Sequence, residues 1–325
     1  MLKLFIPAEY EGIYYGLFML IGFFIPFFSL RLFKNILPRD NGREFALNGK
    51  LSEGKPRGAG LLMISSFVVV TALFVPMDLE LIIYMGFIYL EMLSGYLDDS
   101  SATSWGRLKK GLIDLVVSVG ISTAYCLYNS GKLTFMLFGV SVELPIAVYI
   151  VLATALVWGS INVTNCSDGV DGLCGSLSII SLATVFVLML KVGTSDDFML
   201  VILAAMLMLL AYLWYNTSPS AMLMGDAGSR AIGVLLAISA MKLGDPVLFL
   251  FFAFMLIIDG GLSLFKISCI KFFKIKGFMN GIRTPIHDHM RKNKGYSDTQ
   301  VVVRFSIIQG VISLALIGFT LGVIR

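Results

Sequence analysis

Long apolar segments recur along the whole chain, and they limit its fold more than any other feature. A helix needs about 20 mostly apolar residues to cross the hydrocarbon core of a bilayer. Of the 325 residues, 57% are hydrophobic and 14% are charged, whereas soluble domains carry about 25% charged residues. The chain is therefore predicted to be an all-α polytopic membrane protein that forms one integral membrane domain, residues 1–325.

Ten transmembrane helices are expected from this pattern. Their predicted ranges are 11–32, 59–77, 79–97, 111–128, 145–162, 173–190, 197–214, 230–243, 246–268 and 301–323. The ninth range contains Asp259 followed by Gly260 and Gly261, and a broken helix is expected there because glycine weakens a helix. An even number of spans places both termini on the same side of the membrane.

The basic residues indicate which side that is. Five segments between the spans alternate onto one side: 31–58, 98–111, 162–172, 214–230 and 266–298. They contain 19 of the 25 Lys and Arg residues, and five fall on the other side. Short basic loops stay in the cytoplasm, so this side is predicted to be cytoplasmic and both termini external. A small external β-hairpin is expected around Gly139.

Four polar clusters interrupt the apolar pattern, and all four fall on the predicted cytoplasmic side. They are SGYLDDSS (94–101), NVTNCSDGVDG (162–172), WYNTSPSAMLMGDAGS (214–229) and NGIRTPIHDHMRKNKGYSD (280–298). Taken singly, each has an ordinary explanation, because glycine and aspartate favour turns and one H-x-H pattern is weak support for a metal. Together they place acids beside basic loops at a membrane boundary, where unpaired charge is costly. The combination favours a functional site.

The residue types in these clusters indicate the chemistry. Carboxylates and amides without cysteine ligands suit Mg²⁺, which is held by one or two carboxylates plus substrate phosphates. The surrounding Lys and Arg suit a phosphorylated substrate. A cation that bridges two phosphates at the bilayer edge indicates phosphoryl transfer between a soluble nucleotide and a lipid phosphate. The chain has no Walker A lysine motif and no G-x-G-x-x-G, and nucleic acid is not an expected partner.

With these clusters in this order, the sequence resembles the polyprenyl-phosphate N-acetylhexosamine-1-phosphate transferases over almost its whole length. The motifs that carry the resemblance are GYLDD, NVTNCSDGVDGL, WYNTSPSAMLMGDAGS and TPIHDHMRKNKGYSDTQVVVRF. The chain looks most like the branch that transfers phospho-MurNAc-pentapeptide from UDP-MurNAc-pentapeptide to undecaprenyl phosphate in peptidoglycan synthesis, giving lipid I and UMP.

The resemblance implies ten spans, Mg²⁺ as cofactor and an active site on the cytoplasmic face of the bacterial inner membrane. It also implies contacts with membrane lipids and binding of nucleoside inhibitors, and it allows a homodimer.

Individual roles are implied at matching positions. Asp226 is the expected Mg²⁺ ligand. Catalytic roles are implied for Asp98, Asp99 and Asp168, of which the first two lie beside the lipid phosphate. Substrate binding is implied for a set on three loops: Asn165, Asp171, Asn216, Leu223, His287 and His289. The two histidines belong to a loop that closes over the sugar nucleotide.

Two departures from the family pattern affect expected phosphate and uracil contacts. Ala102 occupies a position where the family usually has a lysine, which leaves Arg107, Lys109 or Lys110 to contact phosphate. Leu223 occupies a position where an aromatic residue is usual, and it would stack less well on uracil.

Three further departures change the charge of the site. Asp288 replaces the middle one of three usual histidines, and its charge would oppose an acidic peptide unless Arg291 or Lys292 neutralises it. KPRGAG (55–60) replaces a T-P-T-M-G-G stretch, and Arg230 follows G-S where an apolar residue is common.

Two other functions stay open at this stage. A transferase for UDP-GlcNAc would use the same chemistry, although a histidine-containing loop followed by one final span argues against it. An ion-coupled secondary transporter could use the intramembrane acids Glu91 and Asp259, but most acids lie at one membrane edge and not at the midplane. The sequence does not decide which acid acts as a base, or between a one-step and a covalent mechanism.

Overall fold

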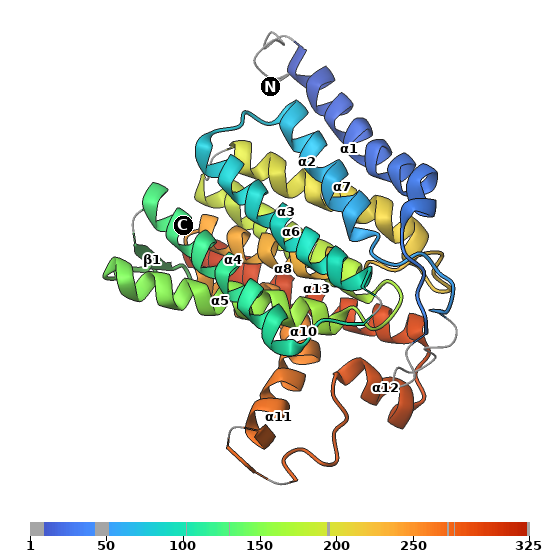
Figure 1. Ribbon diagram of the computed structural model, residues 1–325. Coiled ribbons are helices and arrows are strands. Elements are labelled where there is room, and N and C mark those ends of the chain that lie inside the picture. The colour runs from blue at the N-terminus through green and yellow to red at the C-terminus, as the bar shows by residue number, and fades with distance from the viewer. Residues whose placement is uncertain are drawn as a thin grey trace.

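All ten predicted spans are helical in the computed structural model, which describes residues 10–42, 52–101, 103–129, 131–193, 196–271, 273–275 and 277–323 (Figure 1). Nine of the spans are each a single helix. Their bounds are α1 Glu11–Phe33, α2 Gly60–Phe74, α3 Leu79–Asp99, α4 Arg107–Tyr128, α5 Ile146–Ser167, α6 Leu173–Val192, α7 Asp196–Asn216, α8 Gly225–Lys242 and α13 Asp298–Val323.

The ninth predicted span is a series of short helices. It comprises η5 Pro246–Leu248, α9 Phe249–Phe252, α10 Phe254–Leu256, the π-helix η6 Ile257–Gly261 and α11 Leu262–Lys271. Two short helices outside the spans, η3 Lys34–Ile36 and α12 Ile286–Lys294, were not predicted.

Among the described residues, seven helices are long and apolar enough to cross a bilayer, and the bent ninth segment is an eighth if its halves form one span. The 15 residues of α2 extend only about 22 Å at 1.5 Å per residue, and α8 carries Asp226, Arg230 and Lys242. A helical polytopic membrane protein is thus confirmed. The count of ten spans and the external location of the termini stay predictions.

The break in the ninth span is confirmed, but not at the residues expected. Its halves, Pro246–Phe252 and Phe254–Lys271, meet at 75°. The bend falls at Ala253, whose φ of −113° and ψ of 22° leave the helical region. Gly260 lies inside the π-helix, where a Cβ would come within 2.3 Å of the carbonyl oxygen of Val163. This glycine therefore permits close packing of η6 on α5, and the bend lies elsewhere.

Helix α8 is the most enclosed element, because every residue from Gly225 to Met241 is buried. It packs against α3 and α5 along its length. A Cβ at Gly95 of α3 would lie 2.4 Å from the carbonyl oxygen of Asp226, so no side chain fits between the two helices there. This close packing presses the first turn of α8, which carries Asp226, against the end of α3.

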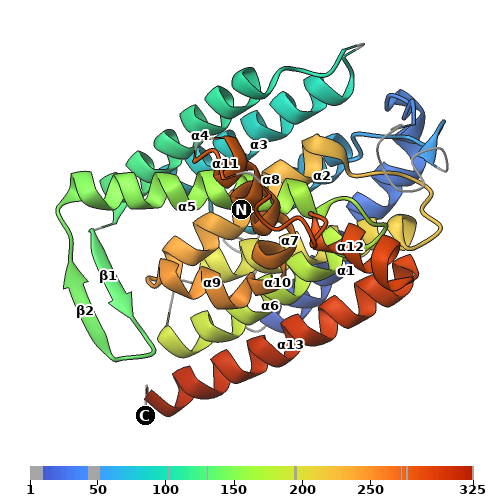
Figure 2. The same cartoon turned by 90° about the horizontal axis from the view of Figure 1, so that it is seen from below.

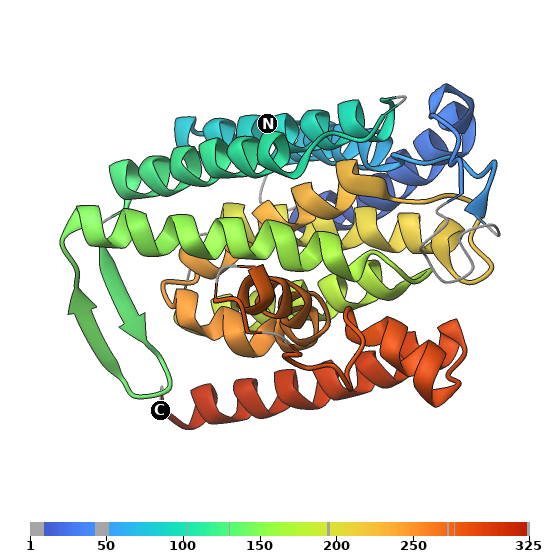
Figure 3. The ribbon, with the colours of Figure 1, turned by 60° about the horizontal axis from the view of Figure 1, so that its bottom comes forward.

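The two ends of the bundle differ. Strands β1 (Lys132–Phe135) and β2 (Val140–Glu143) form an antiparallel hairpin at one end of the bundle, the end to which α13 runs (Figures 2 and 3). The predicted hairpin is confirmed, although its external location stays a prediction. Helix α12 lies at the opposite end (Figure 3), and α11 projects away from the bundle (Figure 1).

Candidate active site

A polar cavity of about 510 Å³ opens at the end of the bundle that lies away from the hairpin. It is formed by the last turns of α3 and α5, the first turns of α4 and α8, and the segment after η3. Four of the predicted site residues line it: Asp98, Asp99, Asn165 and Asp226. Basic side chains line it as well: Arg39, Arg57 and Lys110.

Arg57 joins acids from three parts of the chain. Its Nε donates to Asp99 Oδ1 at 2.9 Å, and its two terminal nitrogens lie 3.4 Å from Asp40 Oδ2 and 3.8 Å from Asp226 Oδ1. Burial of the guanidinium lowers the pKa of Arg57, but Asp99, Asp226 and Asp40 outweigh burial and raise it above its usual value. Arg57 is therefore a permanent cation inside the cavity.

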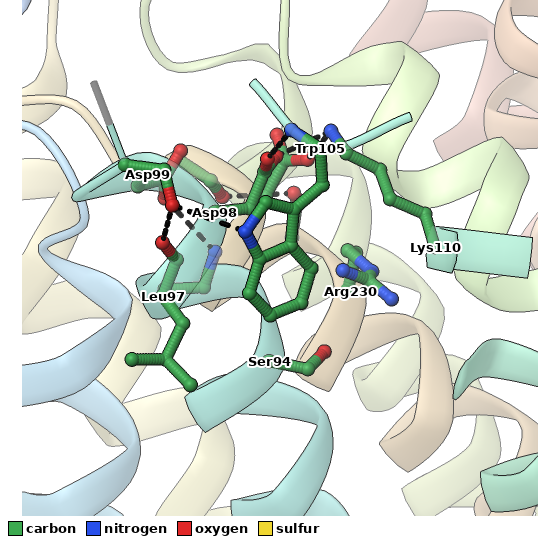
Figure 4. A network of polar contacts seen from close by, with 12 residues as sticks. Ser94, Leu97, Asp98, Asp99, Trp105, Lys110 and Arg230 are labelled. Carbon is green, nitrogen blue, oxygen red and sulfur yellow. Dashed lines mark hydrogen bonds and ion pairs between the residues drawn. The ribbon is translucent and has the colours of Figure 1, made fainter. Parts of the chain in front are cut away.

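Lys110 makes a second bridge between the acids. Its Nζ contacts Asp98 Oδ2 and lies 2.9 Å from Asp226 Oδ2. Asp98 Oδ1 accepts the backbone N–H of Trp105 at 2.6 Å, as Figure 4 shows. Lys109 lies over the indole of Trp105, 3.2 Å from its centre, and thus outside the bridge. Of the three basic residues considered from the sequence, Lys110 is the one that lines the cavity.

Backbone pairing brings Arg57 to Asp226. Leu223 N donates to Pro56 O at 2.8 Å, Ala59 N donates to Leu223 O at 3.0 Å, and Gly60 N donates to Met224 O at 3.1 Å. The KPRGAG segment thus runs beside the residues that precede Asp226. Leu223 is half-buried and contributes its backbone to this pairing.

Two other predicted residues connect neighbouring loops. Asn216 accepts the N–H of Gly172 at 2.8 Å and donates to Met222 O at 2.9 Å. Asp171 Oδ2 accepts the N–H of Ser220 at 2.9 Å. Both side chains therefore hold the loop after α5 against the loop after α7, and their roles in nucleotide binding stay predictions.

His287 lies beside the loop that contains Asp168. Its Nδ1 is 2.7 Å from Asp259 Oδ2, and its backbone N–H donates to Asp259 Oδ1 at 2.7 Å. A Cβ at Gly169 would lie 2.3 Å from His287 Nε2, so only glycine lets the imidazole approach this loop. Asp168 directly follows the last residue of α5, and its N–H donates to Asn165 O at 3.2 Å.

The negative charge of Asp288, where the family usually has a histidine, is paired with a basic residue of the same helix, α12. Arg291 Nη2 lies 2.8 Å from Asp288 Oδ1, and Nη1 lies 2.9 Å from Asp298 Oδ1. The expectation that Arg291 or Lys292 offsets Asp288 is thus confirmed for Arg291. His289 Nδ1 accepts the N–H of Arg283 at 3.3 Å and belongs to the same loop but not to the cavity lining.

The donor set fits a hard divalent cation. Asp98 and Asp226 already share one positive group, the ammonium of Lys110. Among the described residues, no group of three or more His, Cys, Asp or Glu side chains is arranged to hold a metal by itself. A partial protein shell is what Mg²⁺ requires when substrate phosphates and water supply the other ligands. Asp226, with Asp98 beside it, would hold such an ion.

The sequence missed part of the site. Arg57 belongs to the KPRGAG departure from the family pattern, and its position between Gly54 and Gly58 is the signal that could indicate a phosphate contact. The sequence suggests an ion-coupling role for Asp259, whereas the structure shows it as the partner of His287. Ala102 lies outside the described residues.

A helical membrane domain with interleaved acids and bases around one terminal cavity is an arrangement typical of a membrane-embedded enzyme. Residues 81–244 match glycosyl transferase family 4. A phospho-N-acetylmuramoyl-pentapeptide-transferase from Treponema pallidum is 33% identical over 93% of this chain and 88% of its own length. The enzymes of that name from a Wolbachia species of Brugia malayi and from Dinoroseobacter shibae are 27% and 28% identical, over 82% and 86% of this chain and 84% and 82% of their own.

The chain therefore belongs to glycosyl transferase family 4 and, within it, to the phospho-N-acetylmuramoyl-pentapeptide-transferases. As a transferase of this family, it is an enzyme of the membrane, and the transporter alternative is set aside.

Proposed function

We propose that the chain transfers phospho-MurNAc-pentapeptide from UDP-MurNAc-pentapeptide to undecaprenyl phosphate in a Mg²⁺-dependent reaction that yields lipid I and UMP. An oxygen of the lipid phosphate forms a bond to the β-phosphorus of the donor, and the bond from that phosphorus to the oxygen of UMP breaks. The proposed location is the bacterial cytoplasmic membrane, with the cavity facing the cytoplasm. The names of the relatives support this donor class.

The observation that carries the proposal is the alternation of acids and bases in one cavity. Three carboxylates, those of Asp98, Asp99 and Asp226, are interleaved with Arg57 and Lys110. Acids alone would suit a free cation, and bases alone would suit a phosphate. Both together suit a pyrophosphate that shares a cation with the protein and that meets a second phosphate.

Each side chain then has a distinct task. Bound by Asp226 and Asp98, Mg²⁺ would supply neutralisation of the donor pyrophosphate. Arg57 would keep Asp99, Lys110 would keep Asp98, and both would exchange Asp226 for phosphate oxygens, because both are cations at the cavity surface. Asp98, with one oxygen on Trp105 N and the other on Lys110, holds the ammonium where the lipid phosphate would arrive. Asp99 keeps Arg57 in place and accepts the N–H of Ala227 at 3.2 Å.

The loop with α12 would provide contacts to the sugar and peptide. Asp259 fixes the orientation of the His287 ring, and Nε2 then points to the loop of Asp168 and Gly169. Arg291 anchors this arrangement, with Nη2 3.4 Å from the carbonyl oxygen of Gly169. A site that pairs polar substrate groups rejects analogues that lack them by large factors.

The proposal is tested with purified protein in detergent micelles, undecaprenyl phosphate, Mg²⁺ and donor labelled in the peptide. Release of UMP together with transfer of the label to the organic phase is expected, and omission of the lipid phosphate or chelation of Mg²⁺ should abolish both. No closed compartment is needed, so a transport activity would give no product.

The donor is tested in the same assay. UDP-MurNAc-pentapeptide should have a kcat/KM at least about 100-fold above that of UDP-GlcNAc. Equal values would overturn the donor assignment, and absence of UMP release with either donor would overturn the reaction.

A further inference from the structure

A buried ion cluster lies one helical turn below the cavity. Arg230 is 1% exposed, and its Nη2 lies 2.6 Å from Glu91 Oε1 and contacts Asp114 Oδ1. Glu91 and Asp114 are 0% and 4% exposed. Asn162, which lines the cavity, donates its Nδ2 to Asp114 Oδ2 at 3.3 Å. Arg230 is visible in Figure 4 below Lys110 and Asp98.

The members of this cluster share helices with the acids and the base of the cavity. On α8, Arg230 follows Asp226 by four residues. On α4, Asp114 follows Lys110 by four residues, and four residues are about one turn. On α3, Glu91 precedes Asp98 by seven residues, about two turns. Each member therefore lies beneath one cavity residue, on the same face of the same helix.

Stability does not account for the cluster. Two carboxylates face one guanidinium, and Arg230 Nη1 has no hydrogen-bond partner among the described residues. Taking ions out of water costs several kcal/mol each, and well-packed apolar residues of similar volume are often as stable or more stable. An apolar cluster of similar volume at these three positions would avoid this cost.

We propose that Arg230 is a positioning residue for the transfer reaction: by holding Glu91 and Asp114, it sets the separation of Asp98, Lys110 and Asp226 in the cavity above. The inference rests on the proposed function. Arg230 does not touch the substrate. Its ion pairs join α3, α4 and α8 one or two helical turns below the cavity. The cavity side chains on these helices therefore keep their mutual distances.

The expected effect is on turnover more than on binding. A displacement of about 1 Å at reacting groups can cost about 100-fold in rate. Arg230→Leu should lower kcat by about 100-fold and change the KM for the nucleotide donor by less than about threefold. It should also lower the unfolding temperature, because two buried carboxylates lose their partner. Arg230→Lys keeps a cation and should recover at least about 10-fold of the lost kcat.

A second variant separates positioning from folding. The triple substitution Arg230→Leu, Glu91→Gln and Asp114→Asn removes all three charges together and should restore most of the unfolding temperature. Under the proposal, its kcat stays at least about 30-fold below that of the unchanged protein, because the ionic contacts that join α3, α4 and α8 at this level are lost and the reacting groups above them are displaced. Recovery of kcat together with the unfolding temperature would overturn the proposal.

The chain provides a matched control at the other end of the same two helices. Lys242 of α8 lies 3.1 Å from Glu80 of α3. Lys242→Met should lower the unfolding temperature and leave kcat within about twofold, since Lys242 is the last residue of α8 and Asp226 lies in its first turn. An equal loss of kcat in this control would also overturn the proposal, whereas an inactive unchanged protein would count against the proposed function instead.

Discussion

Lys110 Nζ lies 2.9 Å from Asp226 Oδ2 and contacts Asp98 at the same time, so one ammonium joins the end of α3 to the start of α8. From the sequence alone, each of three basic residues near the start of α4 is a candidate for the phosphate contact: Arg107, Lys109 and Lys110. Arg107 is exposed and Lys109 lies on Trp105. The geometry therefore assigns the cavity cation of α4 to Lys110.

Lys110→Met is expected to lower kcat by about 100-fold or more, because a cation aimed at developing phosphate charge is typically worth that factor. The measurement is UMP release at saturating donor and lipid phosphate. Arg107→Met removes the same charge from the same helix turn and should stay within about threefold of the unchanged protein. Equal losses in the two variants would show that bulk charge, and not the contact with Asp98 and Asp226, is responsible.

Asp226→Asn should remove activity by about 100-fold or more while the protein stays folded, because one charge is lost from the group that would bind Mg²⁺. Turnover is measured over a wide range of Mg²⁺ concentrations, with circular dichroism as the check on folding. Glu143→Gln, an exposed change in the hairpin, is the control for removal of one acid. Activity within a few-fold of normal at saturating Mg²⁺ would disprove the metal role.

Arg57→Ala should lower kcat/KM by about 100-fold. The kcat/KM of Arg57→Lys should lie between that of Arg57→Ala and that of the unchanged protein, because an ammonium lacks the planar fork with which a guanidinium can contact Asp99 and a phosphate together. The pKa of Arg57 is raised by Asp99, Asp226 and Asp40 against the effect of burial. Its charge should therefore persist across the whole pH range in which the enzyme is folded. The measurement is the pH–rate profile of the unchanged protein and of Arg57→Lys. A step in the first profile that moves to another pH in the second would contradict a permanent charge on Arg57.

Asp259→Asn should lower kcat by roughly 10- to 100-fold, because the amide no longer fixes the ring of His287 in the orientation seen here. His287→Ala in the same background should then add little, since both changes act on one unit. Kinetics of the two single variants and of the double variant test this coupling. Losses that simply multiply would mean that the two residues act independently.

The helices could be predicted from the sequence because each long apolar segment must avoid water, either by contact with lipid or by burial in the protein. The convergence of the four polar clusters was expected from their location on one side of the predicted spans. Three contacts confirm that these segments meet: Lys110 bridges Asp98 and Asp226, Ser220 donates to Asp171, and Arg291 donates to Gly169. The bend at Ala253 could not be predicted, because no proline or glycine marks it. The pairing of Arg57 with Asp99 and Asp226 also depends on backbone contacts between distant segments.

The complete enclosure of α8 has a consequence for how the protein enters the membrane. This helix carries Asp226, Arg230 and Lys242, and every residue from Gly225 to Met241 is buried by its neighbours. Because α8 contacts no lipid in the folded protein, it can carry charged residues. The same charges give α8 little tendency to enter the bilayer before its neighbours are present. Insertion of α8 should therefore depend on α3 and α5 being in place already. Changes that weaken the apolar contacts of α8, and leave Arg230 and Asp226 intact, should reduce the amount of inserted protein first, with the catalytic rate of the molecules that do assemble unaffected.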